Sequence, residues 1–146
     1  MAKKALVVDD TPANLDFLVR LLTQAGFEVK GETSGKGAAE YMEKVDDLAL
    51  AVVDMQIPDI SGLQLTQKIR AQYEDAYIVV ATMHDQRSLM QSVFDKGGNC
   101  FLVKPHGFME LFKRLTTIDL KVLREAECTV IDQYGPRAFV FAGQRM

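Results

Sequence analysis

The stretch ALVVDDTP (residues 5–12) joins a strand, two adjacent acids and a helix start. Its first residues form a continuous apolar run, which is typical of a strand covered on both faces of a sheet. Thr11 stands where a helix N-cap is expected, and Pro12 stands at the first helical position. Between strand and helix, Asp9 and Asp10 place two like charges side by side, where repulsion and partial burial are both unfavourable. A positive ligand shared by the two carboxylates would account for the arrangement.

The composition of the chain indicates one soluble globular domain. It has 146 residues, of which 48% are hydrophobic and 25% charged, and its net charge is −3. No basic stripe predicts direct binding to nucleic acid. The apolar run near the N-terminus is too short for a signal peptide or a membrane span. Because Cys100 and Cys128 also lack a paired spacing, we expect a cytoplasmic protein that does not contact a membrane.

Apolar runs alternate with segments of helical periodicity along residues 5–117. The helical segments carry their own end signals, such as Gly26 after the first and Ser61 before the third. This alternation predicts right-handed crossovers and a parallel sheet covered by helices on both faces. The fold class is therefore α/β, a three-layer α/β/α arrangement with a five-stranded parallel sheet. The predicted strands are ALVV (5–8), FEV (27–29), LALAVV (48–53), YIVVA (77–81) and CFLV (100–103).

The alternation stops after Thr117. The segment IDLKVLREAE (118–127) predicts a helix that could continue the preceding one. The segment CTVIDQYGPRAFVF (128–141) predicts a hairpin with its turn at Tyr134-Gly135-Pro136. We therefore divide the chain into a domain of residues 1–117 and a C-terminal extension of residues 118–146. The extension is too short to fold independently, and we expect it to pack on its own domain or on a second copy.

Polar residues stand at the ends of four of the predicted strands. The first run ends in Asp9 and Asp10, the third in Asp54, the fourth in Thr82 and the fifth in Lys104. In an open parallel sheet, ligands bind at the carboxyl ends of the strands. We therefore expect three carboxylates, one hydroxyl and one ammonium group in a shared pocket.

The chemistry of these groups indicates a metal ion and a transferred phosphoryl group. Neighbouring carboxylates resist ionising together, and a hard divalent cation relieves their repulsion. An all-oxygen site with few protein ligands suits Mg²⁺. Lys104 and Thr82 would bind an anion beside the metal. A metal, a lysine and a hydroxyl around a carboxylate are what phosphoryl transfer to that carboxylate requires.

At these positions the sequence resembles the receiver domains of bacterial two-component response regulators, over residues 4–117. The resemblance implies a flavodoxin-like sheet with strand order 2-1-3-4-5. The sequence departs from the family pattern at Met83, where the family usually has a small residue. The motifs are VVDD at the first strand end, VVDMQIPDISGLQL around Asp54, ATM with Thr82, and CFLVKP with Lys104.

The resemblance implies an acceptor and a metal site. Asp54 would accept the phosphoryl group and would also contact Mg²⁺. Asp9 and Asp10 would hold the ion from the first strand. The backbone carbonyl of Gln56 would complete the protein ligands.

It also implies a switch. Lys104 would pair with a phosphoryl oxygen and would be followed by a cis bond to Pro105. Thr82 would move toward the phosphoryl group, and Phe101 would rotate into the vacated space. The surface of the fourth helix, fifth strand and fifth helix would then repack, and a homodimer could form there.

The implied function is a phospho-accepting signalling module and not a turnover enzyme. A histidine kinase or histidine phosphotransfer protein would donate the phosphoryl group, and a downstream protein target would read the switched surface. Two alternatives remain open. One is a receiver-like adaptor that works without phosphorylation, an interpretation that Met83 keeps open. The other is a haloacid-dehalogenase-type phosphohydrolase, which would need a second aspartate where Gln56 stands.

Overall fold

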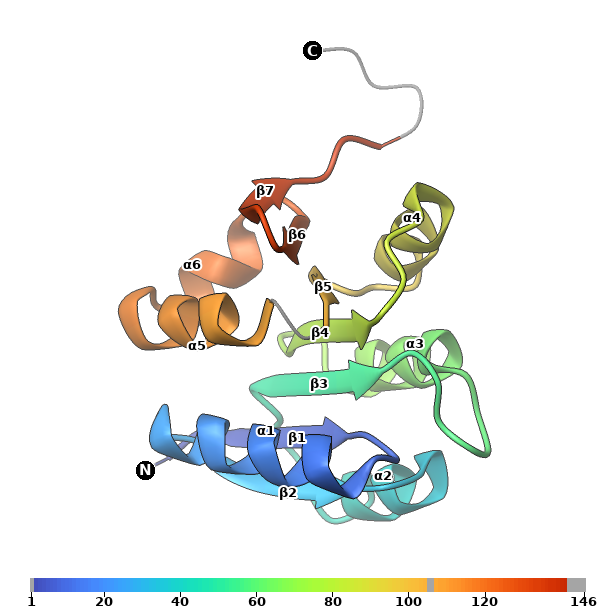
Figure 1. Cartoon of the computed structure of the whole chain (residues 1–146). Coiled ribbons are helices and arrows are strands. Elements are labelled where there is room, and N and C mark those ends of the chain that lie inside the picture. Colours follow the sequence, from blue (N-terminus) through green and yellow to red (C-terminus); the bar gives the residue numbers. More distant parts are fainter. Residues whose placement is uncertain (1, 105–106, 142–146) are drawn as a thin grey trace.

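A seven-stranded sheet forms the middle layer of the protein (Figure 1). The computed structural model describes residues 2–104 and 107–141. The first five strands are parallel neighbours in the order β2-β1-β3-β4-β5, which confirms the predicted order. They are β1 (Lys4–Val8), β2 (Glu28–Glu32), β3 (Leu50–Asp54), β4 (Tyr77–Thr82) and β5 (Cys100–Val103).

Helices cover both faces of the sheet, so the three-layer prediction is also confirmed (Figure 1). The strands β3, β4 and β5 are buried along their whole length, because each face of the sheet packs on its own apolar core. One face carries α1 (Pro12–Gln24), α5 (Gly107–Thr117) and α6 (Leu120–Glu125). The other carries α2 (Gly35–Met42), α3 (Gly62–Gln72) and α4 (Arg87–Asp95).

The C-terminal extension continues the sheet beyond β5. Strand β6 (Thr129–Asp132) pairs with β5 in parallel, and β7 (Gly135–Ala138) pairs with β6 in an antiparallel hairpin. The extension therefore packs on its own domain, as one of the two predicted arrangements required. As a consequence, β5 is an interior strand, and its backbone edge is not open to a second copy or a partner.

Two local features of the extension differ from the sequence prediction. Helix α6 does not continue α5, because the Asp119 side chain starts a new helix by accepting a hydrogen bond from the Lys121 N–H at 2.8 Å. The hairpin turn lies earlier than predicted, so that Gly135 already begins β7. The Asp132 carboxylate accepts from the Tyr134 N–H at 2.9 Å, and Gly135 takes the positive φ, +94°, that returns the chain to β6.

Strand β7 is a sheet edge that is blunted by proline. The Phe139 N–H donates to the Cys128 carbonyl at 2.8 Å, which fixes the alternation of bonds along the hairpin. In this alternation the nitrogen of Pro136 faces away from β6, where its missing N–H removes no bond of the ladder. A proline on the outward side of an edge strand disfavours pairing with another chain.

Replacing Ile131 by alanine tests whether the extension belongs to the folding unit. Ile131 on β6 is fully buried, so Ile131→Ala should lower the free energy of unfolding by about 2–5 kcal/mol. Tyr134→Ala at the exposed turn should change it by less than about 0.5 kcal/mol. Urea denaturation measures both. Equal, small effects would mean that the extension unfolds separately.

Candidate functional site

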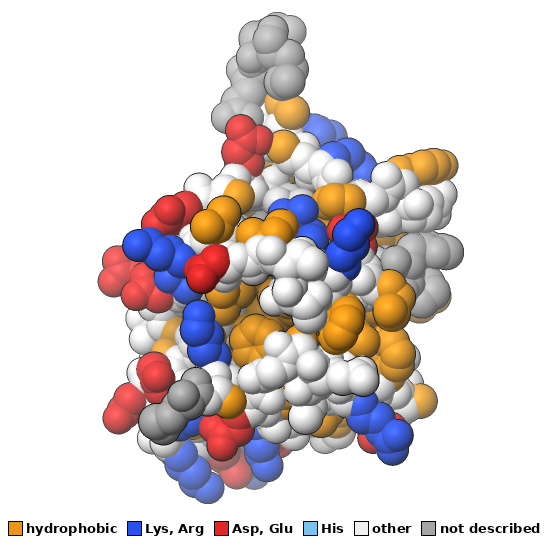
Figure 2. Space-filling view, turned by 90° about the vertical axis from the view of Figure 1, so that its left-hand side faces the viewer, with side chains coloured by type: hydrophobic (Ala, Val, Ile, Leu, Met, Phe, Trp, Pro, Cys, Tyr) orange, Lys and Arg blue, Asp and Glu red, His pale blue; other side chains and the backbone are white. Residues whose placement is uncertain are grey.

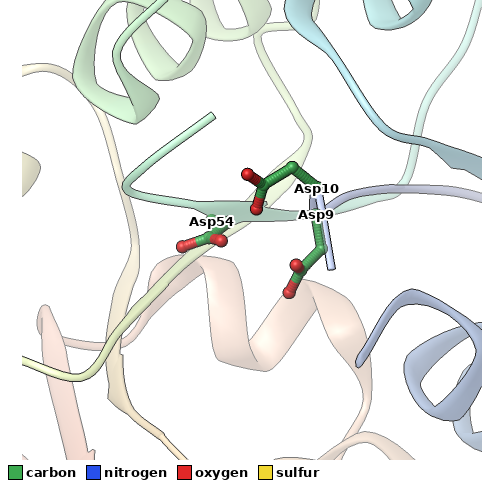
Figure 3. A group of neighbouring side chains, drawn as sticks. All are labelled: Asp9, Asp10 and Asp54. Atoms are coloured by element: carbon green, nitrogen blue, oxygen red, sulfur yellow. The ribbon is translucent and has the colours of Figure 1, made fainter. Parts of the chain in front are cut away.

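Three carboxylates meet at the carboxyl ends of β1 and β3 (Figure 3). Asp54 ends β3, and Asp9 and Asp10 follow β1 directly. The parallel pairing of Val8 with Val53 brings the two strand ends level. Carboxylate oxygens of the three residues lie within 4.8 Å of one another. Asp9 and Asp54 are buried and Asp10 is exposed, so the group opens toward solvent on one side.

Lys104 lies between two of these carboxylates. Its Nζ is 3.3 Å from Asp9 Oδ2 and 3.3 Å from Asp54 Oδ1, and its side chain is 10% exposed. The Lys104 backbone N–H donates to the Thr82 carbonyl at 2.8 Å, which fixes the start of the side chain beside β4. One ammonium group against three carboxylates leaves a net charge of 1 − 3 = −2 at this end of the sheet.

The environment of Asp54 disfavours the charged form of its carboxyl group. Burial raises the pKa of Asp54 above its usual range, and the charge of Asp9 adds to this effect. Lys104 and the Gln56 N–H, which donates to Asp54 Oδ1 at 3.3 Å, lower the pKa but do not cancel the rise. The negative charge of the carboxylates therefore exceeds the positive charge of Lys104, and the atoms that could bind a metal ion are all oxygens. Such a set fits a hard divalent cation.

The Thr11 N–H, and not the Thr11 hydroxyl, orders the start of α1. Thr11 is the N-cap residue, as predicted, but its side chain makes no capping bond. Its backbone N–H instead donates to Asp9 Oδ1 at 2.9 Å. This bond leaves Asp9 Oδ2 directed to Lys104. The Asp9 side chain thus contacts both the start of α1, through Oδ1, and Lys104 in the acidic group, through Oδ2.

Thr82 is placed beside the carboxylates by the sheet register. It ends β4, one residue after Ala81, which pairs with Asp54. Thr82 is buried, and its Oγ1 accepts a hydrogen bond from the His84 N–H at 3.2 Å. The next residue, Met83, is 77% exposed, so most of its side chain faces solvent.

The loop after β3 is closed by a hydrogen bond beside Gln56. Gly62 N–H donates to the Met55 carbonyl at 2.8 Å, and Gln56 and Ser61 face each other across an isolated bridge. That bond joins the residues flanking the bridge, so the Gln56 carbonyl is not needed to close the loop. Only glycine fits at position 62, because a Cβ there would lie 2.5 Å from the Asp54 carbonyl oxygen.

Comparison with known proteins identifies the family. A family model for the response regulator receiver domain matches residues 5–116. The chain belongs to this family. Receiver domains are the phospho-accepting modules of response regulators and are generally not turnover enzymes.

Chemotaxis protein CheY of Thermotoga maritima is 32% identical over 107 residues, covering 72% of this chain and 88% of that protein. Transcriptional regulatory protein HprR of Escherichia coli is 28% identical over 112 residues, covering 77% of this chain and 49% of HprR. The receiver chain thus spans about half the length of that regulator. A solved structure of chemotaxis protein CheY4 of Vibrio cholerae matches with a TM-score of 0.73 at 25% identity, covering 82% of this chain and 100% of that one.

One contact of the loop after β3 was not foreseen from the sequence. Asp59 lies in the loop of residues 55–62, and both its oxygens accept hydrogen bonds, from the Gly35 and Lys36 N–H groups at 2.8 Å each. These bonds lower the pKa of Asp59 and cap the start of α2. Ser34, the predicted cap, binds the next N–H, that of Gly37. Nothing in the local pattern indicated that Asp59 would reach a helix so distant in sequence.

The two predicted residues on and after β5 have different outcomes. Phe101 is fully buried on the face of the sheet that carries α4, between Val80 and Val130 on the neighbouring strands. Its role as a switch residue stays a prediction. Pro105, and with it the predicted cis bond, lies outside the described residues.

Replacing Lys104 tests the electrostatics of the site. Because the ammonium group lowers the pKa of Asp54, Lys104→Met should raise that pKa further. A carbon-13 NMR titration of the aspartate carboxyl groups in metal-free protein measures the change. Arg137→Met removes the exposed ion pair with Asp132 in the hairpin and should leave the Asp54 titration unchanged. An unmoved Asp54 pKa in Lys104→Met would contradict the proposed charge balance.

Proposed function

We propose that this receiver accepts a phosphoryl group on Asp54 from a histidine kinase or a histidine phosphotransfer protein. The observation that carries the proposal is the position of Asp54, buried 3.3 Å from the Lys104 ammonium and within 4.8 Å of the other two carboxylates. A carboxylate held beside a cation can act as a nucleophile, and neighbouring positive charge stabilises the phosphoryl oxygens during transfer.

Magnesium is the proposed cofactor. Asp9, Asp10 and Asp54 would hold it, with the backbone carbonyl of Gln56 as the fourth protein ligand. When bound, Mg²⁺ supplies positive charge that keeps the Asp54 carboxylate ionised and neutralises the transferred group. The excess negative charge of the site and the raised pKa of Asp54 support this assignment.

The side chains around Asp54 would each perform one part of the transfer. An Asp54 oxygen forms the new O–P bond as the N–P bond of the donor phosphohistidine breaks, and the donor imidazole keeps that electron pair. Lys104 pairs with one phosphoryl oxygen. Thr82 turns its hydroxyl from the His84 N–H, whose bond it now accepts, to donate to another phosphoryl oxygen.

Signalling, and not turnover, fits this set of residues best. A dehalogenase-type phosphohydrolase would need an acid or base two residues after the nucleophile, and Gln56 at that place does not ionise. A phosphorylation-independent adaptor would have no use for the complete acid set with Lys104. The proposed output is therefore a change of surface that a downstream protein target reads, in the cytoplasm.

The extension changes which surface a target or a second copy could bind. We propose that the described part of the extension, residues 118–141, folds as one unit with the receiver domain, because β6 covers the edge of β5. A homodimer on this part of the surface would then contact α4, α5 and the hairpin instead of the edge of β5. Direct binding of nucleic acid is not proposed. Basic and acidic side chains are interspersed over the molecular face at the amino ends of the strands (Figure 2). Among the helices of the described residues, none has the length and the apolar character that a membrane span requires.

Acetyl phosphate tests the proposed function directly. Incubation of the protein with acetyl phosphate and Mg²⁺ should add the mass of one phosphoryl group, read by intact mass spectrometry. The gain should be absent in Asp54→Asn and with a chelator in place of Mg²⁺. A mass gain that persists in Asp54→Asn would show that Asp54 is not the acceptor. Repeated hydrolysis of a generic phosphate monoester would favour the phosphohydrolase.

Asp59→Ala tests whether the loop of residues 55–62 positions the Gln56 carbonyl for the metal. Loss of the two bonds to α2 should loosen the loop and raise the Mg²⁺ concentration at half saturation by up to about tenfold. Ser34→Ala is the matched control, because it removes a capping bond from the same helix start without touching the loop. Mg²⁺ titration followed by NMR measures both variants. Equal shifts of the half-saturating Mg²⁺ concentration in the two variants would mean that Asp59 only caps α2 and does not position the loop.

A further inference from the structure

Three aromatic rings join the segment after β7 to α4. We call residues 139–141, which follow β7, the strap. Phe139 packs on Phe94 of α4 at 4.9 Å between ring centroids, and Phe141 lies 6.0 Å from Phe94 and 5.1 Å from Phe139. Phe139 and Phe94 are both buried. The guanidinium of Arg87, the first residue of α4, lies 4.6 Å from the centre of the Phe139 ring. The strap thus covers the side of α4 that carries Arg87 and Phe94, which we call the aromatic face of α4 after its contact with the two strap rings.

The start of α4 is weakly anchored compared with the other helix starts on its side of the sheet. Helix α3 begins with a full capping box at Ser61, and α2 is capped by Ser34 and Asp59. Helix α4 has no side-chain capping bond and no acidic residue in its first turn. It instead begins with Arg87, and a cation at a helix N-terminus is unfavourable. The Phe139 ring lies against the Arg87 guanidinium and so joins this helix start to the strap.

The same helix start is tied to the phosphoryl site through Thr82. Residues 83–86 alone separate the end of β4 from α4. The Thr82 hydroxyl accepts from the His84 N–H within this linker. Rotation of the Thr82 side chain toward a phosphoryl oxygen on Asp54 would carry its hydroxyl oxygen away from the His84 N–H, and the linker would lose the bond that holds it to β4. That loss acts on the first turn of α4, where Arg87 meets the strap.

We propose that the aromatic face of α4 is an interaction surface whose partner is the chain's own strap, and that phosphorylation of Asp54 releases the strap from it. The inference rests on the proposed function and extends it to the output. In the unphosphorylated receiver the strap closes the face. After phosphoryl transfer, the shift of the first turn of α4 separates Arg87 from Phe139, and the rings of residues 139 and 141 leave Phe94. The exposed face and the freed strap are then both available to a target protein.

A single tryptophan can report the strap, because the chain contains none. Phe141→Trp places the reporter at a half-buried position of the strap. With Mg²⁺ and acetyl phosphate, its emission should shift to the red and its quenching by acrylamide should increase. Tyr134→Trp, at an 84% exposed position of the hairpin turn, is the matched control and should not respond. Neither change should occur when Asp54→Asn is added to Phe141→Trp.

Intact mass on the same samples separates the two levels of the proposal. Full phosphorylation with unchanged emission of Phe141→Trp would contradict the release of the strap but not the proposed function. No phosphoryl gain in any variant would overturn both. Arg87→Gln gives a second test without phosphorylation, since losing the cation–π contact should shift the unphosphorylated strap toward release by about two- to fivefold. If Phe141→Trp folds poorly, fluorine NMR of the fluorophenylalanine-labelled native chain measures the same release.

Discussion

Asp9, Asp10 and Asp54 repel one another, and Lys104 offsets only part of their charge. The repulsion is tolerated because the sheet holds the residues in place from outside the site: β1 pairs with β3, and β4 joins β3 to β5, which carries Lys104 to the same end of the sheet. The apolar strands thus provide the free energy that keeps like charges together. What remains is a rim with excess negative charge, which favours a divalent cation over any neutral ligand. The proposed chemistry of the receiver follows from this constraint.

Three of the strand ends share the same local hydrogen bond between a side chain and the backbone. Asp9, Asp54 and Thr82 each accept a hydrogen bond from the backbone N–H two residues later, the geometry of Asx and Ser/Thr turns. These three side chains are therefore fixed to the loops that leave their strands. A ligand that reorients one of these side chains must also act on its loop. This coupling is the physical basis for a signal that leaves the acidic site.

The extension determines where such a signal can emerge. Because β6 occupies the edge of β5, the sheet ends at β7, and the outward nitrogen of Pro136 makes that edge a poor template for pairing. The strap then covers Phe94 on α4. The site itself is that of a receiver, whereas the surface around α4 is shaped by residues beyond 116, where the match to the family model ends.

Much of this protein is determined by the sequence alone. Continuous apolar runs predict strands buried on both faces, and helical periodicity between them predicts crossovers, so the layers and the convergence of Asp9, Asp54 and Lys104 could be predicted. The strand order came from the resemblance to receiver domains. The predicted bounds were least accurate for edge strand β2, because its residues are partly exposed and EVKGE carries no continuous apolar signal. Local caps such as Ser34 were also predictable, because their partners lie within one turn of helix.

Only the tertiary structure decided the contacts between segments that are remote in sequence. Asp59 reaches the start of α2, β6 joins β5, and Phe139 packs on Phe94. None of these follows from periodicity, which reports the buried face of an element but not the element that buries it. The partner is chosen by shape and distance once the whole chain has folded.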